Sequence, residues 1–211
     1  GGSRRETVPA SETEKRYTFR MGVEKGGILW LSGTTGRNPA PTSDEQEYPS
    51  DLLSQVELIY ERHLRTLEEM GYAYTDVVKT VDYLTESALP AYRHTGKLRQ
   101  RYLGNNFPVS TGVVVNRLIR PEAMIEIDMV AVKGDREVIN PGWDRYDQLT
   151  YVPGIKINGF LFVSGFAALD MDSNEVTGDG DLVAQTEASY AGVAAVVEAA
   201  GCSMSDVVKV V

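Results

Sequence analysis

Apolar side chains recur every three or four positions between Ser50 and Gly71. This spacing predicts an amphipathic helix whose buried face carries Leu53, Val56, Tyr60, Leu64, Leu67 and Met70. Ser50 or Asp51 is suited to cap its start, and Gly71 is suited to end it in a left-handed conformation. The residues from Asp76 to Leu84 are rich in β-branched side chains and predict a strand.

The same pattern occurs again later in the chain. Four pairs of identical residues are each separated by 130 positions, namely Gln55 and Gln185, Tyr60 and Tyr190, Gly71 and Gly201, and Asp76 and Asp206. A spacing that repeats in this way indicates an internal duplication, so we expect two related folding units.

The rest of the first copy adds strands on both sides of the helix. Tyr17 to Val23 and Ile28 to Leu31 predict a hairpin that turns at Gly26-Gly27. Ala91 to Leu103 predicts a second helix, with an outward face that carries Arg93, Lys97, Arg99 and Arg101. Thr111 to Asn116 and Met124 to Val132 predict two further strands. One copy is therefore β-β-α-β-α-β-β, an α+β unit with its helices on one face of a mixed sheet.

These elements predict a domain organisation in four parts. Residues 1–16 are a tag scar and a loose lead-in, 17–133 the first copy, 134–145 a linker, and 146–211 the N-terminal half of a second copy. No residues match 82–133 of the first copy, so the second sheet is expected to be half-built. We expect a second polypeptide, the C-terminal remainder of the same precursor, to complete it. A shortened chain or a domain-swapped neighbour are the alternatives.

Charge and composition exclude several classes of partner. The net charge is −9 without a basic cluster, which argues against nucleic acid and against a ribonuclease. The longest apolar runs have the length of a strand, so no membrane partner is expected. A single cysteine, Cys202, fits a reducing, cytoplasmic location. The sequence lacks a metal-ligand cluster and a phosphate loop, so no cofactor is expected.

Polar residues at strand positions are the candidates for chemistry. Glu126 and Asp128 alternate with apolar residues on a central strand, where a carboxylate either reaches solvent at an edge or lines a cleft. Ser32-Gly33 and Ser164-Gly165 end the buried hairpin strands and place a hydroxyl and backbone N–H groups at a rim, or else form plain turns. His63 is interpreted as a packed structural histidine.

Several short motifs occur twice and in the same order. In the second copy they are Phe160-Leu-Phe-Val-Ser-Gly165, Ala184-Gln-Thr186, Glu198-Ala-Ala-Gly201 and Asp206-Val-Val-Lys209. In the first copy they are Leu29-Trp-Leu-Ser-Gly33, Asp76-Val-Val-Lys79 and the closing Ile125-Glu-Ile-Asp-Met-Val-Ala131. On these motifs the chain resembles the RidA/YjgF enamine and imine deaminases over nearly all of residues 17–211.

The resemblance implies a fold, an assembly and a reaction. It implies chorismate-mutase-like units packed around a three-fold axis, as a homotrimer or a pseudo-hexamer, with clefts for a small-molecule substrate between units. The implied reaction adds water to a C=N bond and releases ammonia. Glu126 matches the glutamate that acts on water, and Tyr151 matches a tyrosine that orders the site, whereas the first copy has Phe19 there.

One departure from the motif affects the expected reaction. Ser110 stands where the resemblance calls for an arginine that binds the substrate carboxylate, and Gly112 stands where it calls for a cysteine. Arg37 is a candidate relocated anchor, with a solvated loop arginine as the alternative. We therefore expect a divergent hydrolase acting on an enamine or imine, such as a 2-imino acid or an aminomuconate. The alternative is a ligand-binding or assembly module with decayed sites.

Overall fold

A computed structural model describes residues 3–9, 14–39 and 46–211. The chain forms two compact units. Unit 1 comprises residues 1–107 and 112–133, and unit 2 comprises residues 108–111 and 134–211.

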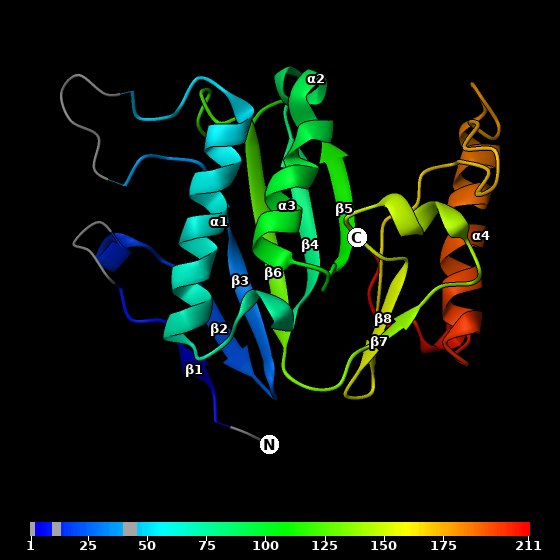
Figure 1. The fold of residues 1–211 in the computed structure, drawn as a ribbon, viewed down its shortest axis with the longest axis horizontal. Helices are drawn as coiled ribbons and strands as arrows, with labels where there is room; N and C mark the ends of the chain where they lie inside the picture. Colours follow the sequence, from blue (N-terminus) through cyan, green and yellow to red (C-terminus); the bar gives the residue numbers. More distant parts are fainter. Residues whose placement is uncertain (1–2, 10–13, 40–45) are drawn as a thin grey trace. The chain divides into compact units, whose positions relative to one another are not determined.

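A six-stranded sheet of order β1-β2-β3-β6-β4-β5 forms the framework of unit 1 (Figure 1). Its strands are β1 (Arg5–Glu6), β2 (Gly22–Lys25), β3 (Ile28–Thr35), β4 (Val77–Leu84), β5 (Val109–Val114) and β6 (Ile125–Val132). The last three residues of β5 belong to unit 1. The central strand β6 pairs antiparallel with β3 and with β4. It alternates buried Ile125, Ile127 and Met129 with the less buried Glu126 and Asp128, because successive side chains point to opposite faces of a sheet.

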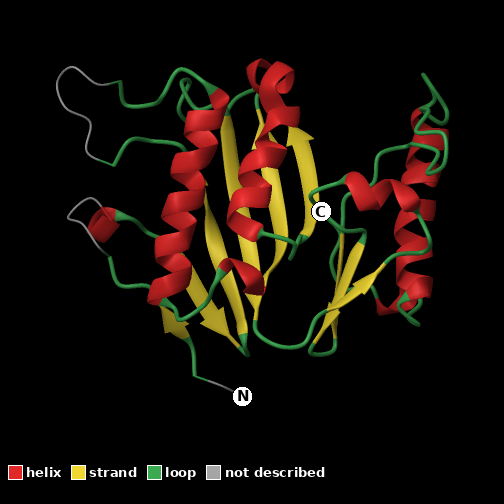
Figure 2. Cartoon of the chain, viewed as in Figure 1, coloured by secondary structure: helices red, strands yellow, loops and turns green. Residues whose placement is uncertain are grey.

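The helices of unit 1 cover one face of this sheet (Figure 2). They are α1 (Leu52–Glu69), α2 (Leu89–Tyr92) and α3 (Gly96–Leu103), with 3-10 turns at Glu14–Arg16, Tyr74–Asp76, Glu86–Ala88 and Arg93–Thr95. Asp51 caps α1 by accepting a hydrogen bond of 2.9 Å from the Ser54 N–H, which lowers the pKa of its carboxyl. Gly71 ends the helix at φ 76°.

Burial between the helices and the sheet produces the core of unit 1. Leu52, Ile59 and Leu67 of α1 pack on Leu29, Ile125 and Met129 of the sheet. His63 is buried among them, and its Nε2 lies 2.9 Å from the carbonyl oxygen of Ile127. Burial lowers the pKa of His63 to about 4, so the ring is neutral and structural, as its helix position predicts.

Unit 2 contains a smaller sheet of order β7-β8-β9 and one long helix. Its elements are β7 (Glu137–Ile139), β8 (Gly154–Ile157), β9 (Phe160–Val163) and α4 (Leu182–Ala199), with 3-10 turns at Asp144–Gln148 and Met204–Asp206. Asn158 and Gly159 form the hairpin turn with φ 49° and 79°. Gly154 lies where a Cβ atom would come 2.5 Å from Val196 Cγ1 of α4, so only glycine allows this close packing.

Several expected elements differ in the structure. The lead-in contains β1, which pairs with β2, whereas Tyr17 to Met21 forms no strand. Residues 134–145 contain β7, which pairs with β8 and so belongs to a sheet. Residues 207–211 form no strand.

Side-chain burial corrects two further expectations. Leu53 is exposed, and the neighbouring Leu52 faces the core in its place. Arg99, expected on a solvated face of α3, is buried beside Asp82 of β4, and the distance from Arg99 Nη1 to Asp82 Oδ2 is 3.9 Å.

No helix in the described part of the chain combines the length and the apolar character needed to span a bilayer.

Candidate functional site

A β-bulge in β3 brings two of the expected residues to the face of the sheet opposite the helices. Leu31 pairs with Met129 and Thr34 with Ile127, so that Ser32 and Gly33 together oppose Asp128. The extra residue directs Gly33 toward Glu126, and a Cβ atom added to Gly33 would overlap the Glu126 carboxylate. The glycine is therefore what allows a carboxylate to lie against this strand.

The surroundings of Glu126 favour its protonated form more than water does. Its side chain is half-buried, and burial together with the nearby Asp128 raises the pKa of the carboxyl. Tyr83 of β4 is the register partner of Glu126, and its hydroxyl hydrogen-bonds to Asp128. Burial and the two carboxylates raise the pKa of Tyr83. A carboxyl with a raised pKa on an open sheet face is suited to accept and return a proton.

The loop after the bulge is held from α1. Arg62 donates to Thr34 Oγ1 at 2.8 Å, to the Thr35 carbonyl at 3.0 Å and to the Arg37 carbonyl at 2.8 Å. The Arg37 side chain pairs with Glu47, with 2.5 Å between Nε and Oε1. The structure thus places Arg37 in an ion pair within this loop, where a substrate carboxylate would have to compete with Glu47.

The serine and glycine of the second copy lie in unit 2 next to residues 108–111. Ser164 Oγ donates to the Val152 carbonyl at 2.6 Å and accepts from the Ser110 N–H at 2.9 Å. The Gly165 N–H donates to the Ser110 carbonyl at 3.1 Å. A Cβ atom added to Gly165 would lie 2.7 Å from Thr111 Cγ2, so this corner of unit 2 is closely packed.

Tyr151 belongs to an aromatic cluster in unit 2. Its ring meets Tyr146 edge-on at 5.7 Å between centroids, and Tyr146 in turn contacts Trp143 at 6.0 Å. Burial raises the pKa of Tyr146 to about 12. The eight predicted site residues therefore form two groups, with Ser32, Gly33, Arg37 and Glu126 in unit 1 and Ser110, Tyr151, Ser164 and Gly165 in unit 2.

Two residues that organise the site in unit 1 are missing from the sequence-based prediction. Arg62 has no local signal, because its three acceptors lie 25 to 28 positions away. Gln55 is buried and donates from Nε2 to the carbonyls of Pro49 and Glu122, while its Oε1 accepts from the Met124 N–H. The repetition of this glutamine as Gln185 was the available clue.

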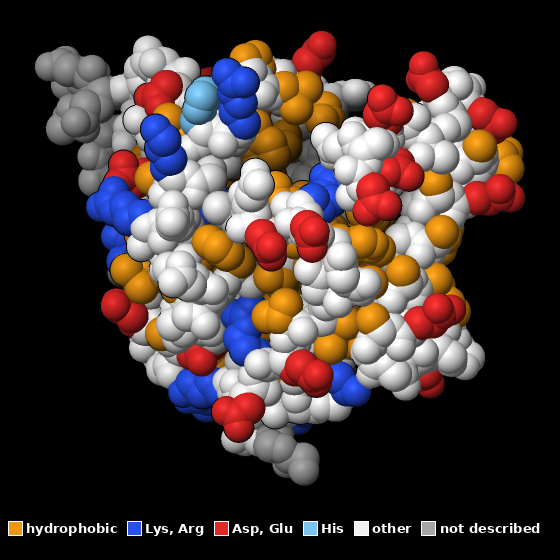
Figure 3. Space-filling model, turned by 45° about the vertical axis from the view of Figure 1, so that its right-hand side comes forward, with side chains coloured by type: hydrophobic (Ala, Val, Ile, Leu, Met, Phe, Trp, Pro, Cys, Tyr) orange, Lys and Arg blue, Asp and Glu red, His pale blue; other side chains and the backbone are white. Residues whose placement is uncertain are grey.

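Metal and phosphate chemistry gain no support from the described residues. No group of histidine, cysteine or acidic side chains within that part of the chain could hold a metal ion. Figure 3 shows acidic side chains over much of the visible face, with most of the Lys and Arg side chains on its left-hand side.

Comparison with known proteins gives consistent results. A family model described as Endoribonuclease L-PSP matches residues 9–133 and 146–211. A RutC family protein of Pyrococcus abyssi is 38% identical over 60 residues, which cover 28% of this chain and 46% of the relative. One of Synechocystis is 37% identical over 59 residues, covering 28% and 45%. This chain therefore spans less than half the length of these relatives.

Solved structures agree on the fold. Rv2704 of Mycobacterium tuberculosis, a member of the YjgF/YER057c/UK114 family, matches with a TM-score of 0.52 and 27% identity. The match covers 62% of this chain and all of that one. A Rid family protein of Yersinia pestis, YyfA, has a TM-score of 0.51 at 20% identity with the same coverage, and it supports the fold alone.

Proposed function

Because the chain belongs to the Endoribonuclease L-PSP family, the RidA/YjgF family, we propose that it hydrolyses an enamine or imine and releases ammonia. The observation that carries this proposal is the half-buried Glu126 carboxyl against Gly33, with a pKa raised by burial and by Asp128. Substrates of the proposed class are 2-imino acids and aminomuconate-like compounds.

Glu126 performs the proton transfers in the proposed reaction. Its carboxylate accepts a proton from water as the water oxygen bonds to the imine carbon. The same carboxyl then returns this proton to the nitrogen, which gives a carbinolamine. Glu126 next transfers the proton of the new hydroxyl group to the amine nitrogen as the C–N bond breaks, and ammonia and a carbonyl product leave. The raised pKa strengthens Glu126 as a base, and activity should fall as the pH drops through that pKa.

An ammonia-release assay on 2-imino acids, generated by an amino acid oxidase, tests the role of Glu126. Glu126→Gln keeps the shape and removes the basicity, so we expect turnover to fall by about 10²- to 10⁴-fold with little change in stability. Glu68→Gln, at an exposed glutamate of α1, is the matched control and should retain full activity. An unchanged rate in Glu126→Gln would remove Glu126 from the mechanism.

The second candidate function is a binding or assembly module without catalysis. It is favoured by unit 2, where Ser110 replaces the arginine of the motif and its backbone is bonded to Ser164 and Gly165. Tyr151→Phe separates the two candidates in the same assay. A large loss of activity supports an enzyme that uses Tyr151, and no ammonia release from either substrate class by the unmodified chain supports the module. A parallel assay of RNA cleavage tests the endoribonuclease activity that the family description names.

We further propose that the units pack around a three-fold axis, as a homotrimer or a pseudo-hexamer. Trp30, Val113 and Val114 are large apolar side chains exposed on strands of unit 1, and apolar surface of this kind is typical of an interface. Light scattering of the chain should give a mass of about three or more copies, and a monomer would contradict the proposal.

We also propose that unit 2 binds a segment equivalent to residues 82–133 of the first copy, supplied by a second polypeptide from the same precursor. The support is its exposed apolar surface, which includes Leu182, Val183, Tyr190 and Val208. The matching residues of unit 1, Tyr60 and Val78, are both buried. The comparison of Tyr60 with Tyr190 in the Discussion tests this proposal.

A further inference from the structure

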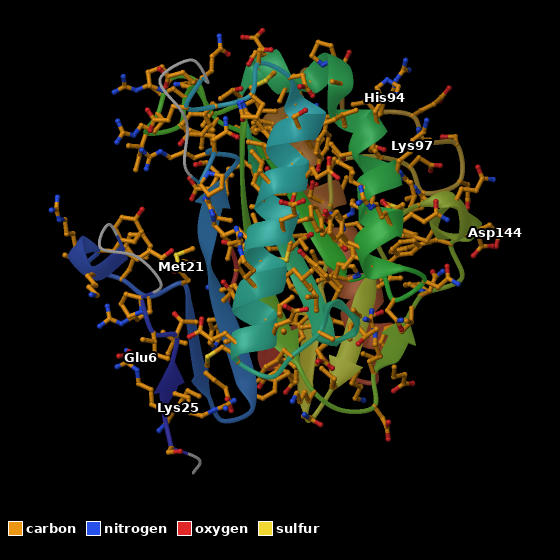
Figure 4. All side chains as sticks on the ribbon, turned by 60° about the vertical axis from the view of Figure 1, so that its left-hand side comes forward. Glu6, Met21, Lys25, His94, Lys97 and Asp144 are labelled. Carbon is orange, nitrogen blue, oxygen red and sulfur yellow. The ribbon has the colours of Figure 1, made fainter. Side chains whose placement is uncertain are left out.

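A hollow of about 380 Å³ opens in unit 1 beside the bulge of β3. Ser32 lines it, together with Phe19 and the two arginines Arg4 and Arg20. Glu6 is the acidic residue of its lining, so two guanidinium groups face one carboxylate. In Figure 4, Glu6 and Met21 mark the edge of unit 1 that carries β1 and the chain leading into β2. The hollow thus combines a residue expected to bind substrate with an excess of positive charge.

Arg20 has unused hydrogen-bonding capacity in this hollow. Its nearest carboxylate is that of Glu6, with 3.5 Å between Nε and Oε1, which is longer than a normal hydrogen bond. Glu6 also pairs with Arg4, at 3.1 Å. The Arg20 side chain donates no hydrogen bond to another residue in the described ranges and is about one-third exposed. An exposed pair at this distance is weak, so a ligand can compete for the guanidinium.

The backbone of Arg20 is fixed relative to the candidate catalytic residues. Ser32 Oγ donates to the Arg20 carbonyl at 2.7 Å, and the Ser32 N–H donates to the Met21 carbonyl at 2.9 Å. Ser32 is the residue before Gly33, against which Glu126 lies. The ring of Phe19 stacks on Tyr17 at 4.9 Å and gives the hollow an apolar wall. The backbone of Arg20 is therefore hydrogen-bonded to Ser32, the residue before the glycine that contacts Glu126.

We propose that Arg20 binds the carboxylate group of a small 2-oxo or 2-imino acid in this hollow, where it supplies the positive charge that Ser110 lacks. The inference rests on the proposed function, since Ser32 lines this hollow and precedes Gly33, against which Glu126 lies. A guanidinium group offers two parallel N–H donors to a carboxylate, which a lone serine hydroxyl cannot. The residue of the second copy that matches Arg20 is Val152, which has no charge, so the anchor belongs to the first copy alone.

Calorimetric titration of the 211-residue chain with pyruvate measures the anchor without requiring turnover. Arg20→Gln should weaken pyruvate binding by about ten- to one-hundred-fold, the loss expected for a charged hydrogen-bonded pair. Arg65→Gln makes the same change of charge at an exposed position of α1 and should leave binding unchanged. Glu6→Gln removes the competing carboxylate and should tighten binding, a gain that a purely structural role for Arg20 would not produce.

The outcomes separate the anchor from the reaction. Binding of pyruvate that depends on Arg20, in a chain that releases no ammonia from imines, keeps the anchor and overturns the proposed function. Ammonia release with a KM that Arg20→Gln leaves unchanged keeps the function and overturns the anchor. Equal weakening by Arg20→Gln and Arg65→Gln would show a general charge effect and would also overturn the anchor. An Arg20→Gln chain with an altered circular dichroism spectrum is replaced by Arg20→Lys, which should bind pyruvate with intermediate affinity.

Discussion

The two copies of the repeat share the same local hydrogen bonds, helix ends and turns, and they differ in what their helices contact. Ser32 and Ser164 each donate to the carbonyl of the residue 12 positions earlier, at 2.7 and 2.6 Å. Gly71 and Gly201 end α1 and α4 with φ 76° and 74°. The turns that follow are closed by Asp76 and Asp206, which accept from backbone N–H groups at 2.9 and 2.8 Å.

Burial of the helices is where the copies diverge. Tyr60 of α1 is 1% exposed and stacks on Tyr102 at 5.0 Å, whereas Tyr190, the same position of α4, is 48% exposed. Arg62 of α1 holds the loop after β3 by hydrogen bonds, while its counterpart Gly192 packs against the Phe166 ring, where a Cβ atom would come within 2.8 Å. The local hydrogen bonds and turns are thus the same in both copies, because the short motifs that encode them are the same. Burial of each helix depends instead on residues that are distant in the sequence.

Truncation of the two matched tyrosines should give the largest difference between the copies. Tyr60→Ala removes a stacked, buried ring and should lower the free energy of unfolding by about 3–5 kcal/mol. Tyr190→Ala should change it by no more than about 0.5 kcal/mol in the isolated chain. Urea unfolding of both variants measures the difference. Equal losses in the isolated chain would contradict the difference in burial. With the proposed second polypeptide bound, Tyr190→Ala should cost more than in the isolated chain, and an unchanged loss would contradict that proposal.

A smaller difference should appear as a dependence on pH. His63 has a pKa of about 4 in the folded chain and about 6.5 when unfolded, so the unfolded chain binds the proton first as the pH falls. The stability from the neutral ring is complete above about pH 6.5 and is lost progressively toward pH 4, by about 3 kcal/mol. Its counterpart Val193 cannot titrate, so His63→Val should remove this loss from unit 1.

Urea midpoints between pH 4 and 7.5, compared for the unmodified chain and His63→Val, measure that contribution. The comparison is needed because burial raises the pKa of Asp82, which stabilises the fold as the pH falls and so acts in the opposite direction. Identical pH profiles for the two chains would contradict the assignment.

Sequence patterns predicted the elements that rest on local signals. β4 spans Val77–Leu84 of the predicted Asp76–Leu84, and α1 begins after Asp51, one of the two predicted caps, because a β-branched run and a capping side chain act within a few residues. The family and its fold also followed from short motifs that occur in order. One position of the predicted buried face of α1 was wrong, since Leu52 and Leu53 both fit an apolar stripe and only packing selects Leu52. The predicted Val56, Tyr60, Leu67 and Met70 are buried.

Features that depend on distant partners could not be predicted. β1 is two residues long and exists through its pairing with β2, about 18 positions away. Arg99 reads as a solvated helix residue until the fold brings Asp82 of β4 beside it. Residues 207–211 have strand-forming side chains, yet they lie outside the strands of the described chain, so their composition alone did not determine their conformation. The hollow around Arg20 likewise depends on β1 and on the turn into β2.

The buried Gln55 side chain determines how the floor of the site can open. The Met124 N–H, just before β6, donates at 2.9 Å to a side chain on α1 that lies 69 positions earlier. This amide is freed when the bond breaks, either by rotation of the buried Gln55 side chain or by separation of the chain at Met124 from α1. Its exchange with deuterated solvent therefore reports on the packing between α1 and the start of β6. Slow exchange at Met124 would show that α1 holds in place the strand end that leads to Glu126.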